Sequence, residues 1–261
     1  MVIVLKIMNY WQQRMARESN SLLQKQYDDI DEELRKYFLE ITERLKKEVE
    51  AYYGKILSDS PQDAVRTHQL MFGRQFELYN ELSKQLVALG NKNTTLLEDY
   101  LVKYYQDNYD LMVRQNGFQV PPPNMDRVRQ TVNGVWVQDG KNWSQRIWIN
   151  LENLQNSIQK MLTDAVVTGI SADKLTEQLM NDMNVGYYEA NRLARTELAH
   201  VRIVSSIDSY KDAGVTRYRY LANGPHMCKE CEELNGKEFD INDTEHLPPQ
   251  HPFVFALYLL S

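Results

Sequence analysis

The chain has 261 residues, enough for one large or two ordinary domains, and 43% hydrophobic and 25% charged residues are typical of a globular protein. This composition excludes a disordered or collagen-like chain. The net charge is −6, from 30 Lys and Arg against 36 Asp and Glu, and the charges divide evenly between the two halves of the chain. There is no basic surplus for sequence-independent DNA binding, so any contact with nucleic acid has to be local.

The longest apolar runs lie at the two ends, in residues 2–8 and 253–260. Both are too short to span a bilayer, and polar residues follow the first run where a signal peptide would place small ones. We therefore expect synthesis in the cytosol and no membrane partner.

The first predicted helix covers residues 21–53, where apolar side chains recur every three or four positions. They are Leu23, Tyr27, Ile30, Leu34, Tyr37, Ile41, Leu45, Val49 and Tyr52. The segment opens with acidic residues and turns basic later, the order that a helix dipole favours. So long an apolar stripe predicts packing against another helix, either of this chain or of a neighbour.

The same periodicity and capping signals predict further helices along the chain. These cover residues 61–90, 94–117, 147–169, 171–183 and 187–212, with Gly90, Gly117, Gly169 and Gly214 as end signals. Pro121, Pro122 and Pro123 cannot continue a helix, and a loop-rich passage with Trp136 and Trp143 follows them. We therefore expect at least five helices longer than ten residues.

After Gly214 the period changes, because Tyr218 and Tyr220 alternate with Arg217 and Arg219 as in a half-buried strand. A second short strand near residues 237–241 would complete a hairpin. The predicted fold class is mainly α, with long helices and a small C-terminal β-hairpin or zinc-knuckle-like unit.

Three regions follow from these patterns. Residues 1–120 form a helical interaction region, residues 121–146 form a linker that contains Pro and Trp, and residues 147–261 form a C-terminal domain that ends in the knuckle. All strands are expected in the last region.

The most specific chemical signal is the pair Cys228 and Cys231 in a turn-rich setting. Two thiolates at this spacing can form half of a tetrahedral zinc site, and His251 is the natural third ligand, ahead of His226 and His246. The alternative is a pair of reduced cysteines without metal. A thioredoxin-like redox pair is disfavoured because the chain lacks an alternating β-α pattern, and two cysteines cannot form a disulfide framework.

The second signal is Arg195-Thr196-Glu197, a structural motif on a predicted helix. Spacing places Glu197 and His200 among core positions, and a buried carboxylate needs a cationic or backbone partner. We expect a structural ion pair in which Glu197 is paired with an arginine of its helix or with amides of the hairpin. The alternative is catalysis by Glu197 and His200.

The order of these features resembles the minor head proteins of tailed bacteriophages, the Mu F-like head-morphogenesis family. The resemblance covers roughly residues 150–252 and rests on Ala194-Arg195-Thr196-Glu197, the Cys228 and Cys231 pair, Leu234-Asn235-Gly236 and the sequence Pro248-Pro249-Gln250-His251-Pro252. The opening Asn9-Tyr10-Trp11 and the long charged helix after it also look like the N-terminus of such proteins.

The resemblance implies a non-enzymatic head component, associated with the portal vertex, that acts in procapsid assembly and in DNA packaging or delivery. Its implied partners are the portal protein or scaffold, with self-association and DNA contact as further expectations. Its implied location is the host cytoplasm during assembly and then the capsid interior of the virion. Val254 stands where the family has a further cysteine, so the expected zinc site lacks its fourth ligand. The competing class is an enzyme, a nuclease or an ADP-ribosyltransferase-like protein that uses Glu197 and His200.

Overall fold

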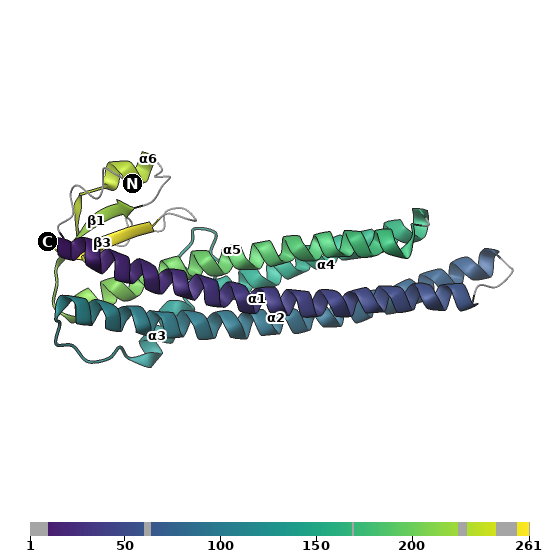
Figure 1. The fold of residues 1–261 in the computed structure, drawn as a ribbon, viewed down its shortest axis with the longest axis horizontal. Coiled ribbons are helices and arrows are strands. Elements are labelled where there is room, and N and C mark those ends of the chain that lie inside the picture. Colours follow the sequence, from purple (N-terminus) through teal and green to yellow (C-terminus); the bar gives the residue numbers. More distant parts are fainter. Residues whose placement is uncertain (1–9, 60–63, 169, 224–228, 244–254, 261) are drawn as a thin grey trace. The chain divides into compact units, whose positions relative to one another are not determined.

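In the computed structural model the chain is mainly helical, with a small sheet near its C-terminus (Figure 1). The structure describes residues 10–59, 64–168, 170–223, 229–243 and 255–260. The helices of this described part are α1 (Tyr10–Asp59), α2 (Ala64–Asn116), α3 (Met125–Val132), α4 (Trp143–Thr168), α5 (Ala172–Asp212) and α6 (Lys229–Leu234). The strands are β1 (Arg217–Asn223), β2 (Glu238–Asp240) and β3 (Phe255–Leu260).

The chain divides into two compact units, each made of segments that are distant in the sequence. Unit 1 comprises Met1–Ile30, Leu97–Gly140 and Ala194–Ser261, and unit 2 comprises Asp31–Leu96 and Lys141–Leu193. Helices α1, α2 and α5 each contribute residues to both units. These compact units are assembled from several segments, whereas the predicted regions 1–120, 121–146 and 147–261 are consecutive in the sequence. The boundaries of the predicted regions stay a prediction.

The apolar stripe of α1 is buried by the rest of this chain. Leu23, Ile30, Ile41 and Leu45 are each at most 1% exposed. The stripe departs from the sequence prediction at one position, because Phe38 and not Tyr37 is the buried aromatic residue. The expectation that the stripe packs against a helix is thus met inside the molecule.

Helix α2 continues through Gly90, so the prediction that a helix ends there is wrong. A methyl group on Gly90 would lie 2.5 Å from Leu151 Cδ1 and 2.8 Å from Trp148 Cζ3. The glycine is therefore needed for close packing of α4 on α2. Nor does a separate helix begin at residue 94, because α2 continues through it and the Thr94 hydroxyl donates to the Gly90 carbonyl oxygen at 2.8 Å.

Helix α5 likewise continues through Gly186, where two helices had been predicted. A methyl group there would meet Leu154 Cδ2 at 2.9 Å and Phe38 Cε1 at 3.2 Å. The fusions at Gly90 and Gly186 leave four helices longer than ten residues in the described part of the chain, α1, α2, α4 and α5, where at least five had been expected.

The strands of the described residues all follow Gly214, as predicted, and form an antiparallel sheet in the order β2-β1-β3. Tyr218 and Tyr220 of β1 are fully buried, and they pack in a cluster with Ile203, Ile207 and other apolar residues of unit 1. On β1, Arg219 lies opposite Glu238 of β2 and pairs with it at 2.5 Å. The third strand, β3, pairs with β1 over six residues and had not been predicted.

Candidate functional site

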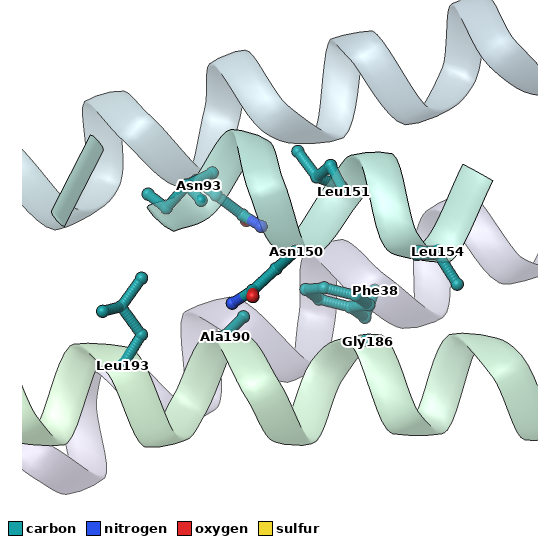
Figure 2. A pocket seen from close by; sticks show the side chains of 9 residues that line it. Phe38, Asn93, Asn150, Leu151, Leu154, Gly186, Ala190 and Leu193 are labelled. Carbon is teal, nitrogen blue, oxygen red and sulfur yellow. The ribbon is translucent and has the colours of Figure 1, made fainter. Parts of the chain in front are cut away.

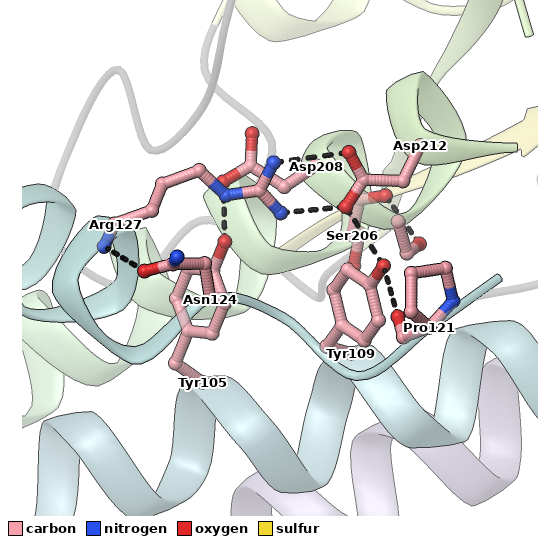
Figure 3. Close-up of polar contacts among 9 residues, drawn as sticks. Tyr105, Tyr109, Pro121, Asn124, Arg127, Ser206, Asp208 and Asp212 are labelled. Atoms are coloured by element: carbon pink, nitrogen blue, oxygen red, sulfur yellow. Dashed lines mark hydrogen bonds and ion pairs between the residues drawn. The ribbon is translucent and has the colours of Figure 1, made fainter. Parts of the chain in front are cut away.

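The passage that follows the prolines is anchored on the end of α5 by a polar network (Figure 3). Asn124 caps α3, since its side-chain oxygen accepts from the amides of Asp126 and Arg127. The guanidinium of Arg127 then binds both oxygens of Asp212, with Nη1–Oδ1 at 2.9 Å and Nη2–Oδ2 at 2.6 Å. This two-point geometry fixes the direction of α3 as well as its position.

Tyrosines of α2 complete the network from the opposite side. The hydroxyl of Tyr109 lies 2.8 Å from Asp212 Oδ2 and 3.3 Å from the carbonyl oxygen of Pro121, and Tyr105 donates to Asp208. The hydrogen bonds from Arg127 are the main reason why the pKa of Asp212 lies below its ordinary value. Two helices and the proline passage are thus tied to the last turns of α5.

The loop that follows α3 places Trp136 against the Arg195-Thr196-Glu197 motif on α5. The indole nitrogen of Trp136 donates to Glu197 Oε2 at 2.8 Å, and Glu197 is only 2% exposed. The Trp136 ring also stacks on the imidazole of His200, with 4.1 Å between the ring centres and 7° between the planes. Burial of Glu197 is therefore confirmed, and its partner on this side is an indole from the loop after α3.

Arg195 of the motif contacts α1. Its guanidinium lies 4.5 Å from the ring centre of Tyr27, and the Tyr27 hydroxyl donates to the Arg195 carbonyl oxygen at 3.2 Å. Burial raises the pKa of Tyr27 to about 12, so the phenol stays neutral in ordinary buffers. The motif is thus a junction that joins α1 and the Trp136 loop to α5 within unit 1.

This arrangement is poorly suited to acid-base chemistry. A general acid or base works best with a pKa near the operating pH, whereas burial lowers the pKa of His200 to about 3. One face of its imidazole is covered by Trp136, and the Glu197 carboxylate is engaged by the same residue. The geometry fits a structural contact better than a reactive pair.

Trp136 and Arg127 were missed by the sequence reasoning, which placed both in a loop-rich passage. Their partners are 61 and 85 positions away in the chain, so no local spacing could reveal the pairs. One signal was available, since the N–H of a partly buried tryptophan usually finds an acceptor.

Among the predicted zinc ligands, Cys228 and His251 lie outside the described residues, as do His226 and His246. Cys231 belongs to α6, but its side chain is outside the description as well. The described backbone around α6 is fixed by a turn at Gly236, whose φ is 83° and whose amide donates to the Tyr220 carbonyl oxygen at 2.8 Å.

Residues 156–253 match the family described as phage Mu protein F like protein. This segment belongs to the Mu F-like family. The Mu F-like segment begins inside α4 and contains α5, β1, α6 and β2, together with Glu197 and the Cys228 and Cys231 pair. Trp136 and helices α1 to α3 lie outside this segment. Within unit 1, the Mu F-like segment therefore packs against residues from other parts of the chain, as the hydrogen bond from Trp136 to Glu197 illustrates.

A curated protein, the NAD(+)–arginine ADP-ribosyltransferase EFV of Enterococcus faecalis, is 23% identical to this chain over 247 residues. The aligned region is 90% of this chain and 48% of that protein, so the chain spans about half the length of this relative. No solved structure matches the chain.

Proposed function

We propose that this Mu F-like protein is a minor head protein that binds the portal protein or scaffold during procapsid assembly and takes part in DNA packaging or delivery. The observation that carries the proposal is the family match over residues 156–253. On this proposal the protein assembles in the host cytoplasm and ends inside the capsid. In the described part of the chain, no helix is long and apolar enough to cross a membrane.

The test is co-purification of the tagged chain with the portal protein of the same phage, followed by electron microscopy of procapsids made without the chain. We expect a stable complex, and heads that are fewer or defective when the chain is missing. The double variant Ile30→Asp and Ile41→Asp serves as an unfolded control, because both side chains are at most 1% exposed. Normal, infectious particles without the chain would refute the proposal.

A transferase is the second candidate function, and the relative's name is the observation that favours it. We propose instead that this chain is not an enzyme, on two grounds: Glu197 and His200 are held by Trp136, and about half of the relative lies outside the match. Labelled NAD⁺ with free arginine as acceptor tests this directly. Transfer by the wild-type chain that Glu197→Gln abolishes, with folding retained, would overturn the structural role of the motif.

We also propose that zinc binds at Cys228, Cys231 and His251, and that the metal stabilises the C-terminal unit. Two thiolates and one imidazole are a donor set that suits zinc, and Val254 cannot supply a fourth ligand. Val254→Cys should therefore raise the zinc content measured by mass spectrometry, and Cys231→Ser should lower it. Equal and negligible zinc in all three proteins would show that the cysteines are simply reduced.

A further inference from the structure

Unit 2 contains a small cavity where α1, α2, α4 and α5 meet (Figure 2). Its volume is about 20 Å³. Most of its lining is apolar, including Phe38, Leu154 and Leu193, and the two exceptions are Asn93 and Asn150. A cavity needs about 10–15 Å³ to hold one water molecule, so this one has room for a single water.

Asn93 interrupts an apolar stripe of α2. The stripe runs through Leu82, Leu86 and Leu89, all at most 2% exposed, and the next step of four residues arrives at Asn93. Asn93 is itself 3% exposed, and its Oδ1 atom has no hydrogen-bond partner in the described part of the chain. A buried amide oxygen without a partner costs free energy, and the usual remedy in a protein interior is a bound water.

The second asparagine faces the same space from α4. In Figure 2 the side chains of Asn93 and Asn150 both point into the cavity, between Phe38 and Leu193. A water placed there can donate one hydrogen to Asn93 Oδ1 and keep its other hydrogen and its lone pairs for the Asn150 amide. Two polar side chains around a volume of this size satisfy the conditions that distinguish a hydrated cavity from a dry apolar one.

Side chains of α4 and α1 pack closely on the glycine positions of α2 and α5 beside the cavity, and its volume of about 20 Å³ leaves no room for a larger ligand. Gly90 lies one turn before Asn93 and is in contact with α4, and Gly186 lies one turn before Ala190 and is in contact with Leu154 and Phe38. Beside the cavity, these glycine contacts thus join α2 to α4, and α5 to both α4 and α1.

We propose that this cavity is a specific binding site for one structural water, which bridges Asn93 on α2 and Asn150 on α4. The water satisfies the buried amide oxygen and links the two helices at a defined register, as a buried polar residue does in other helical bundles.

The test uses the full chain and needs no ligand besides water. Magnetisation transfer from water to the side-chain amide protons of Asn93 and Asn150, in NMR experiments that separate bound water from exchange, should show one long-lived water. The signal should disappear in Asn93→Leu and persist in the control Asn91→Leu, since Asn91 is an exposed residue of the same helix.

If Asn93→Leu does not fold, a crystal structure of the wild-type chain tests whether the cavity holds a water. One density peak within hydrogen-bond distance of Asn93 Oδ1 and the Asn150 amide is expected. An empty cavity, a direct hydrogen bond from a protein group to Asn93 Oδ1, or the absence of a long-lived water in the wild-type spectra would each overturn the proposal.

Discussion

Replacing Gly90 with alanine tests whether close packing of α4 on α2 is the reason for a glycine inside a long helix. Alanine is favoured over glycine by about 1 kcal/mol in a helix interior, so propensity alone predicts stabilisation. The added methyl group would however lie 2.5 Å from Leu151 Cδ1 and 2.8 Å from Trp148 Cζ3. Leu151 is 7% exposed, so it has little room to move away.

Overpacking of this kind costs about 1–3 kcal/mol, which offsets or exceeds the gain in propensity. We therefore expect that Gly90→Ala leaves the free energy of unfolding unchanged or lowers it by up to about 2 kcal/mol. The matched control is Gly73→Ala in the same helix, where no atom of the described residues lies within 4 Å of the new methyl group. That variant should gain about 0.5–1 kcal/mol.

Urea unfolding, followed by far-UV circular dichroism, gives the free energy of unfolding of both variants. The two values are comparable if this free energy falls with urea concentration at the same slope in both variants. Gly90→Ala should be the less stable of the pair by about 1–3 kcal/mol. If both variants were stabilised equally, Gly90 would have no packing role, and the explanation for the uninterrupted α2 would be wrong.

Three further predictions concern unit 1. In a double-mutant cycle, Trp136→Phe and Glu197→Ala should show a coupling of about 1–3 kcal/mol, because the first removes the donor and the second the acceptor of one hydrogen bond. Additive effects would contradict this contact. Because burial lowers the pKa of His200 from 6.5 to about 3, unfolded His200 gains its proton first as the pH falls. Stability should therefore drop below pH 6.5 by up to about 1.4 kcal/mol per pH unit, and urea titrations of His200→Phe should show a shallower fall. Arg127→Gln should raise the pKa of Asp212 in an NMR titration. The stability that the ionised Asp212 contributes would then be lost at a higher pH than in the wild type. An unchanged pKa would show that the two-point contact with Arg127 does not lower the pKa of Asp212.

Local patterns in the sequence determined the secondary structure class and much of the core. The spacing of Leu23, Ile30 and Ile41 predicts the buried side of α1, and the alternation of Tyr218 with its neighbours predicts β1. These features depend on periods of 3.6 and 2 residues, which a single segment displays by itself. The family resemblance, confirmed over residues 156–253, also follows from short motifs in a fixed order.

Only the tertiary structure decided where the helices end and what Glu197 contacts. Gly90 has the sequence signature of a helix end, and Gly186 falls in the gap between two predicted helices. Both nevertheless lie inside a helix, where a neighbouring side chain occupies the space that a Cβ would fill. Likewise, the indole that binds Glu197 comes from residue 136, a position defined by the distant contact of Arg127 with Asp212. Such contacts join segments that share no local pattern, so the chain has to fold before they exist.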